Sequence, residues 1–97
     1  YTSGQIALNT DGDIVSDEIV GQTKQVLHNL KAILEDNNSN MNNVIKVGIF
    51  MANMDDFQVV NEIYAKAFGE HKPVRSTVAV KTLPKNVLIE MDVIAKV

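Results

Sequence analysis

The sequence predicts one domain of the α+β or α/β class, in which two helices cover one face of a sheet. Three observations lead to this prediction. The 97 residues suffice for one hydrophobic core and little more. Two stretches carry apolar residues at helical spacing, and shorter apolar runs typical of strands lie around them. The predicted order is strand, helix, strand, helix, strand, strand.

The first half of the chain is expected to form a strand, a helix and a second strand. Residues 1–8 have the pattern of a strand, and an Asp-Gly turn follows them. Ser16 or Asp17 is expected to cap the helix. The buried face of this helix is predicted from its apolar residues: Ile19, Val20, Val26, Leu27, Leu30, Ile33 and Leu34. The next strand is expected at residues 44–51.

The second half is expected to contain one helix and two strands. Asp55 is the predicted N-cap of the helix, because Gln58 three residues later completes a capping-box pattern. Gly69 is the expected C-cap. The apolar stripe of this helix comprises Phe57, Val60, Tyr64 and Phe68. The last two strands are placed at residues 76–82 and 87–94.

Alternation of side chains in the last two strands predicts that the sheet has an open face. The residues expected to point toward the core are Val78, Val80, Ile89, Met91 and Val93. Arg75, Thr77 and Glu90 are then expected to share the open face. Leu88 and Ile94 would lie beside them, which makes this face too apolar to remain in water. The pattern therefore predicts an oligomer with Arg75 and Glu90 near its interfaces.

Arg75 is the one arginine among nine basic residues of the chain. A guanidinium is always charged and presents a planar pair of donors, which suits two-point binding of a carboxylate. The alternative interpretation is a solvated charge at the end of a strand.

Composition excludes several kinds of site. The chain has no cysteine, so a disulfide, a thiol nucleophile and a thiolate metal site are all ruled out. His28 and His71 are far apart in the sequence, which argues against zinc. A net charge of −3 and a pI near 5.2 argue against broad binding of nucleic acid. No apolar run reaches the roughly 20 residues of a membrane span, and the expected compartment is the cytoplasm.

The segment Pro73-Val74-Arg75-Ser76, followed by Ile89-Glu90-Met91, resembles the signature of the RidA (YjgF) family of imine deaminases. Residues 2–6, 22–30 and 56–71 extend this resemblance over essentially the whole chain. It implies an α+β domain with a mixed sheet and two helices on one face, the chorismate-mutase-like RidA fold. It also implies a homotrimer whose sheets line a central barrel, with ligand clefts between subunits. Residues 1–97 would form a single domain, expected to lack its N-terminal strand region.

The resemblance also implies a reaction. Reactive 2-imino acids made by pyridoxal-phosphate enzymes would be hydrolysed to 2-keto acids and ammonia, without a cofactor or a metal. Arg75 would bind the substrate carboxylate, and Glu90 would activate water. Thr77, Ser3 and Gly4 would complete the substrate-binding pocket. Well-studied deaminases of the family carry cysteine at the position of Thr77, and a backbone contact there would tolerate this difference.

Other functions are weighed against this one. A non-catalytic trimer that senses a ligand, regulates a partner or acts as a chaperone would use the same cleft. A ribonuclease is disfavoured by the acidic pI and the lack of a basic, aromatic-rich surface. A chorismate mutase is disfavoured because its dianionic substrate calls for more cations than one arginine.

Several polar and aromatic residues are given structural roles. Asn61 interrupts an apolar stripe and is interpreted as a buried hydrogen-bonding residue in preference to a ligand contact. Tyr64 and Phe68 are expected in the core and not as a stacking platform. His71 is expected to cap the second helix or to face solvent. Ser3 lacks the surroundings of a nucleophile.

Overall fold

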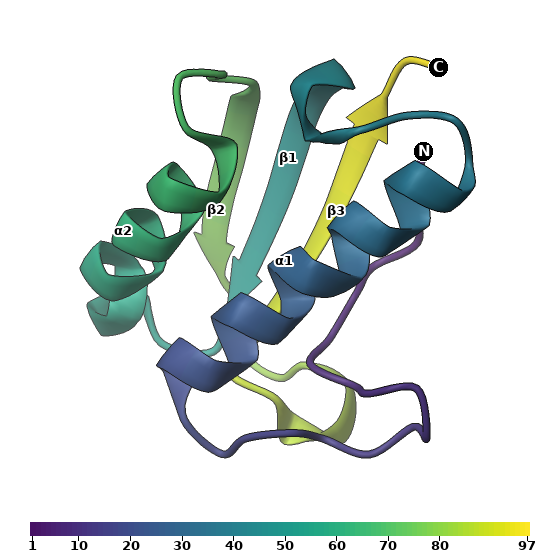
Figure 1. Ribbon diagram of the computed structural model, residues 1–97. Coiled ribbons are helices and arrows are strands. Elements are labelled where there is room, and N and C mark those ends of the chain that lie inside the picture. Colours follow the sequence, from purple (N-terminus) through teal and green to yellow (C-terminus); the bar gives the residue numbers. More distant parts are fainter.

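A computed structural model describes residues 1–97, with elements in the order helix, strand, helix, strand, strand (Figure 1). The elements are α1 (Ile19–Asp36), β1 (Val44–Met51), α2 (Phe57–Phe68), β2 (Val74–Ala79) and β3 (Ile89–Ala95), with short 3-10 turns at Met41–Asn43, Met54–Asp56 and Pro84–Asn86. Both predicted helices and three of the four predicted strands are therefore confirmed, and the domain is of the α+β class.

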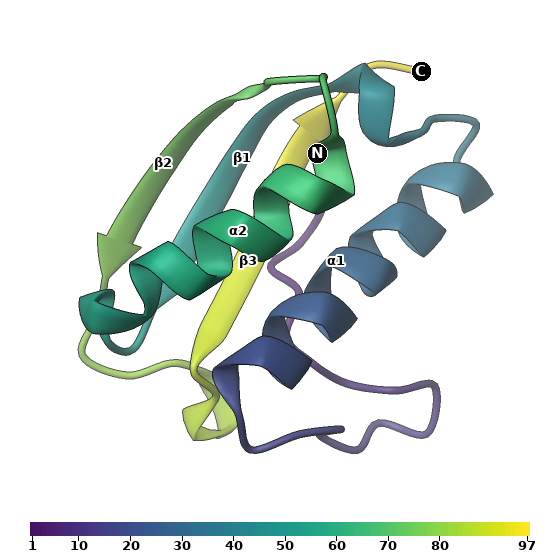
Figure 2. The ribbon, with the colours of Figure 1, turned by 60° about the vertical axis from the view of Figure 1, so that its left-hand side comes forward.

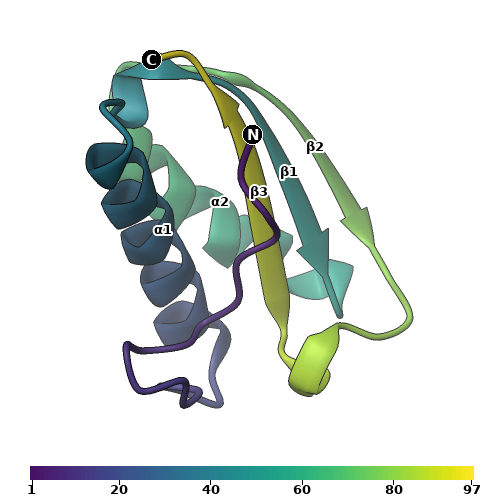
Figure 3. The same cartoon turned by 90° about the vertical axis from the view of Figure 1, so that its right-hand side faces the viewer.

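The sheet has three strands in the order β2-β1-β3. β1 runs parallel to β2 and antiparallel to β3, so the sheet is mixed, as the family resemblance implies. α2 forms the crossover between the two parallel strands. Figures 2 and 3 show both helices lying along one face of the sheet. The sheet therefore has a helix face and an open face.

Strand pairing assigns each side chain to one of these faces, because paired residues point to the same side. On β1, Val47, Ile49 and Met51 are buried beneath the helices. Their partners on the helix face are Arg75, Thr77 and Ala79 of β2, and Val93, Met91 and Ile89 of β3. The open face carries the alternate residues: Lys46, Gly48 and Phe50 of β1, Val74, Ser76 and Val78 of β2, and Glu90, Asp92 and Ile94 of β3.

α1 buries most of the face that its periodicity predicts. Its buried residues are Gln22, Thr23, Val26, Leu27, Leu30 and Leu34. Val20 is 40% exposed, so its predicted burial is wrong. Gln22 is buried instead, and its side chain donates to the Ser16 carbonyl and accepts from the Leu88 backbone N–H. A polar side chain can be buried here because both ends of its amide are hydrogen-bonded.

The predicted strand at residues 1–8 is wrong, although the segment does run beside β3. The Thr2 N–H donates to the Val93 carbonyl at 2.9 Å, and the Gln5 N–H donates to the Met91 carbonyl at 2.7 Å. Between these two hydrogen bonds the N-terminal segment moves on by three residues, whereas β3 moves on by two. This extra residue interrupts the ladder, as in a β-bulge, and leaves only an isolated bridge between Gln5 and Met91.

The bounds of the later strands also differ from prediction. β1 occupies the predicted residues, but β2 begins at Val74 and ends at Ala79. Its extent follows from pairing with β1, which runs from Lys46–Val74 to Met51–Ala79. β3 begins at Ile89, after a turn in which Lys85 and Asn86 both have a φ of 55°.

The helix starts are capped by other residues than those predicted. The Ser16 hydroxyl accepts from the Glu18 N–H at 3.0 Å, and Glu18 itself is the N-cap of α1. A 3-10 turn precedes α2, and the Asn53 side chain caps it by accepting from the Asp55 N–H at 2.9 Å. Asp55 is therefore capped and does not itself cap α2. Gly69, with a φ of 61°, is the C-cap of α2, as predicted.

Candidate functional site

Arg75 and Thr77 lie on the helix face of the sheet, so their predicted place on the open face is wrong. Arg75 pairs with the buried Val47, and its guanidinium carbon lies 4.9 Å from the centre of the Tyr64 ring. Val78, predicted to be in the core, is on the open face and 45% exposed. The two valines of β2, Val74 and Val78, thus point away from the helices, because pairing with β1 decides which side chains of β2 face them.

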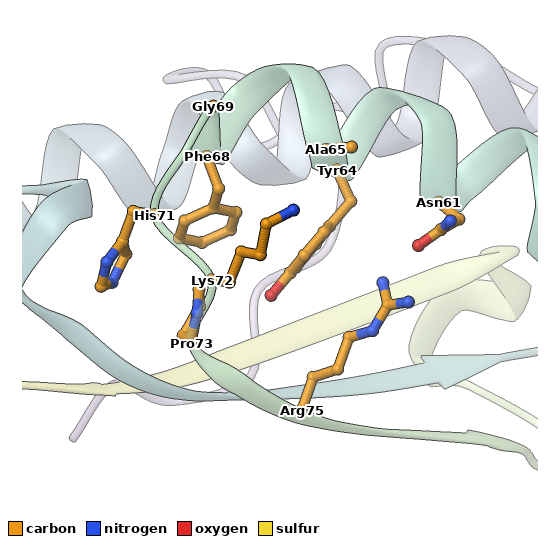
Figure 4. A pocket seen from close by; sticks show the side chains of 9 residues that line it. All are labelled: Asn61, Tyr64, Ala65, Phe68, Gly69, His71, Lys72, Pro73 and Arg75. Atoms are coloured by element: carbon orange, nitrogen blue, oxygen red, sulfur yellow. The ribbon is translucent and has the colours of Figure 1, made fainter.

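The Arg75 side chain reaches into a cavity of about 280 Å³ between α2 and the start of β2 (Figure 4). The cavity is lined by Asn61, Tyr64, Ala65, Phe68, Gly69, His71, Lys72, Pro73 and Arg75. The guanidinium carbon lies over two rings of α2, 5.5 Å from the centre of the Phe57 ring and 4.9 Å from that of the Tyr64 ring. Aromatic faces attract the cation without occupying its N–H donors. Arg75 is therefore held in place while its donors remain free for an anion.

Tyr64 combines a core position with a place in this cavity. Its side chain is 7% exposed, as the helical spacing predicts, yet its hydroxyl has no hydrogen-bond partner. Burial raises the pKa of Tyr64 above its ordinary value of 10.0, while the Arg75 charge acts to lower that pKa. Sequence reasoning missed the stacking role of this ring. The available signal was a tyrosine on the helix that directly precedes the one arginine.

Three further residues line the cavity. Asn61 is half-buried and not buried as predicted, and it lines the cavity beside Arg75 (Figure 4). The Nε2 atom of His71 lies 2.7 Å from the Val44 carbonyl oxygen, so the ring ties the α2–β2 connection to β1 and does not point to solvent. The His71 backbone N–H donates to the Phe68 carbonyl at the end of α2 at 3.2 Å, in keeping with its predicted capping role. Lys72 also lines the cavity and was not singled out from the sequence.

A second group of predicted site residues gathers on the open face around Glu90. Glu90 is half-buried and pairs with Phe50 of β1. A Cβ atom at Gly4 would lie 2.8 Å from the Glu90 Cδ and 3.0 Å from each carboxylate oxygen. Only a glycine therefore lets the N-terminal segment lie this close to the carboxylate. Ser3 is exposed beside Gly4, and its hydroxyl accepts from the Gln5 side-chain amide at 3.2 Å.

The five predicted site residues thus form two groups separated by the sheet. Arg75 and Thr77 lie on the helix face, while Glu90 lies on the open face with Gly4 against it. The first group can bind an anion, and the second offers a proton acceptor. No three His, Cys, Asp or Glu side chains gather to form a metal site.

Comparisons with known proteins point in one direction. Residues 1–97 match the family model described as endoribonuclease L-PSP. A protein of Dermatophagoides farinae named 2-iminobutanoate/2-iminopropanoate deaminase is 38% identical over 93 residues, which cover 95% of this chain and 73% of that protein. The mitochondrial protein MMF1 of Saccharomyces cerevisiae is 46% identical over 95 residues, which cover 98% of this chain and 66% of MMF1. YyfA of Yersinia pestis, a solved structure of the Rid protein family, has a TM-score of 0.97 at 44% identity, covering 100% of this chain and 79% of YyfA.

The compartment of this chain is not assigned by these findings. No helix of the structure combines the length and the apolar content needed to cross a bilayer. The name of the yeast relative places that relative in mitochondria. The cytoplasmic location therefore stays a prediction.

Proposed function

This chain belongs to the endoribonuclease L-PSP family, the RidA (YjgF) family that its sequence resembles, and we propose that it hydrolyses reactive 2-imino acids to 2-keto acids and ammonia. One relative is named as a deaminase of this kind. The observation that carries the proposal is the placement of Arg75, which is held on the Tyr64 ring with its donors directed into a cavity. Such a group binds a carboxylate, which every 2-imino acid contains.

Binding through Arg75 fixes one end of the substrate. Two parallel N–H···O bonds from a guanidinium to a carboxylate hold both the position and the orientation of the bound acid. Asn61, half-buried at the same cavity, has an amide free to donate to the substrate. The imine carbon, which is next to the carboxylate carbon, is then held at a defined place for attack by water.

Glu90 supplies the proton acceptor for that attack. Water adds to the electrophilic imine carbon, its oxygen forms the new C–O bond, and its proton passes to the Glu90 carboxylate. The same proton is then delivered to nitrogen, which gives a carbinolamine. Glu90 next transfers the hydroxyl proton of the carbinolamine to its nitrogen, the C–N bond breaks, and ammonia leaves as the C=O bond forms. Carbon is neither oxidised nor reduced, so the reaction requires water alone as the second reactant.

One copy of the chain cannot provide both groups to one substrate, because Arg75 and Glu90 lie on opposite faces of the sheet. We therefore propose that Arg75 and Thr77 of one copy meet Glu90, Gly4 and Ser3 of another in a homotrimer. The open face supports this assembly, since Val74 and Val78 on it are 66% and 45% exposed. Exposed apolar residues grouped on a sheet face favour contact with another subunit.

The reaction can be tested with 2-iminobutanoate and 2-iminopropanoate, generated in place from an amino acid by a dehydratase or an oxidase. Competition with semicarbazide reports the lifetime of the imine. The protein is expected to shorten that lifetime, and Arg75→Ala and Glu90→Gln are each expected to abolish the effect. Lys66→Ala, which removes a charge on α2 outside the Arg75 cavity, is the matched control and is expected to retain activity. A folded oligomer without any acceleration would favour the ligand-sensing, regulatory or chaperone-like alternative.

A further inference from the structure

The cavity that receives Arg75 contains more positive charge than one carboxylate requires. Lys72 lines it together with Arg75, and none of the nine lining residues is acidic. The chain as a whole has a net charge of −3, so this accumulation of cations is local. Figure 4 shows the two charged side chains on either side of the Tyr64 ring. The cavity thus has two cationic ends.

The backbone at Lys72 is fixed by its neighbours in the chain, while the lysine side chain itself is exposed. On one side, the His71 ring lies 2.7 Å from the Val44 carbonyl oxygen and anchors the connection to β1. On the other side, the ring of Pro73 restricts the backbone that leads into β2. The lysine therefore extends from a segment that is constrained at both flanking residues, which lowers the entropy lost when a ligand binds.

A second observation at the same end points to a ligand. The Tyr64 hydroxyl is buried, and it has no hydrogen-bond partner within the chain. Buried hydroxyl groups are nearly always hydrogen-bonded, because an unpaired one loses its interaction with water without compensation. Figure 4 shows this hydroxyl on the Lys72 side of the ring, directed away from the guanidinium. A donor and a cation without partners thus lie at the end of the cavity opposite Arg75.

We propose that Lys72 and the Tyr64 hydroxyl form a second carboxylate subsite, so that short dicarboxylic acids are the preferred ligands of this cavity. Arg75 would bind one carboxylate and Lys72 the other. The inference rests on the proposed function for its substrate class, which becomes the dicarboxylic 2-imino acids, with the imine of aspartate as the four-carbon member. The competing interpretation, a solvated lysine at a surface turn, predicts no preference between acids.

Binding of two four-carbon acids tests the subsite without any chemistry. Succinate and butanoate differ only in the second carboxylate, and calorimetric titration of the assembled protein gives the affinity for each. We expect succinate to bind about tenfold more tightly, the effect of one added charge-assisted hydrogen bond. The ratio of the two affinities is expected to fall close to one in Lys72→Ala and below one in Lys72→Glu. Lys66→Ala removes an equal charge from α2 outside the cavity and is expected to keep the ratio.

Tyr64→Phe measures the contribution of the Tyr64 hydroxyl to the affinity ratio separately from that of the Lys72 charge. This variant keeps the ring beneath Arg75 and is expected to lower the ratio by a few fold, less than Lys72→Ala does. Equal affinities for succinate and butanoate in the natural protein would overturn the inference. A ratio that persists in both Lys72 variants would overturn it as well.

Hydrolysis assays on the same proteins distinguish this inference from the proposed function. A protein that hydrolyses 2-iminobutanoate but binds both acids equally overturns the dicarboxylate subsite and leaves the deaminase function standing. A protein that shows the Lys72-dependent affinity ratio but hydrolyses neither 2-iminobutanoate nor the imine of aspartate supports the subsite and overturns the deaminase function. The full inference expects the ratio together with faster turnover of the imine of aspartate than of 2-iminobutanoate.

Discussion

At the scale of single residues, Gly4 leaves no room for a side chain beside the Glu90 carboxylate. A methyl group at Gly4 would meet the end of the Glu90 side chain at 2.8 Å, and this flexible side chain can move aside. Gly4→Ala is therefore expected to displace the carboxylate. We expect kcat/KM for imine hydrolysis to fall about 10- to 100-fold, as small misplacements of catalytic groups do. The unfolding free energy is expected to change little.

Gly12→Ala is the matched control for that experiment. Gly12 has a φ of +84° and no atom within 4 Å of an added Cβ, so the substitution strains the backbone without touching the site. It is expected to cost about 1–2 kcal/mol of unfolding free energy and to leave kcat/KM unchanged. If Gly4→Ala loses stability and keeps its activity, the close approach to Glu90 has no catalytic role.

Tyr64 gives a second prediction at this scale. Burial raises its pKa above 10.0 and Arg75 counteracts that rise, so Arg75→Ala is expected to raise the pKa of Tyr64 further. The absorbance of tyrosinate measures this pKa directly. The background is Tyr1→Phe, because the chain has two tyrosines and Tyr64 is then the one that remains. A pKa that falls on removal of Arg75 would contradict the stacked arrangement.

The raised pKa also links Tyr64 to stability at alkaline pH. A folded-state pKa above the ordinary value means that the folded protein holds this proton more tightly than the unfolded chain. The resulting stabilisation is fully present below pH 10.0 and is lost as the pH rises through the higher folded-state pKa. In Tyr64→Phe this alkaline loss of unfolding free energy is expected to be absent.

At the scale of elements, the start of α2 depends on one side chain. The Asn53 side chain accepts from the Asp55 N–H at 2.9 Å, so Asn53→Ala is expected to cost about 1 kcal/mol of unfolding free energy. Asp55→Ala removes only a charge near the positive end of the helix. Its smaller effect is expected to vanish in high salt, since salt screens exposed charges. Denaturant midpoints in low and high salt measure the loss of unfolding free energy in each variant. If Asn53→Ala and Asp55→Ala lose equal amounts in high salt, Asn53 is not the cap.

The same scale explains which elements the sequence predicted well. α1 and α2 each carry apolar residues at helical spacing, and β1 is a nearly continuous apolar run. These patterns, bounded by polar segments, suffice to place the three elements. The segment at residues 1–8 has a strand-like pattern too, but its extra residue against β3 breaks the ladder. That mismatch depends on how the two segments meet, and neither segment contains it alone.

At the scale of the whole molecule, the opposite placement of Arg75 and Glu90 yields a prediction about assembly. If each site joins Arg75 of one copy to Glu90 of the next, Arg75→Ala and Glu90→Gln are inactive alone but complement each other. In trimers assembled at random from equal amounts of both, about one site in four combines two intact residues. Co-expression with two affinity tags isolates the trimers that contain both variants. In each of these, one site of three combines two intact residues, so about a third of the natural activity is expected. Mixed trimers without activity would show that the two residues act within one copy.

The sequence by itself determined the chemistry that this protein can offer and the class of its fold. The lone arginine, the glutamate of the last strand and the family signature can all be identified from the order of the residues alone. Alternation also determines which side chains of one strand share a face, as the buried Ile89, Met91 and Val93 confirm.

Only the tertiary structure decided which face each strand turns toward the helices. The sequence of β2 is compatible with either face turned to the helices, since valines alternate with Arg75 and Thr77. Pairing with β1 places Val74 and Val78 on the outer face. The physical reason is that alternation relates neighbours along one strand, whereas the helix face is defined by side chains of other segments. The same reason accounts for the cavity, because Tyr64, Lys72 and Arg75 meet only when α2 folds back over β2.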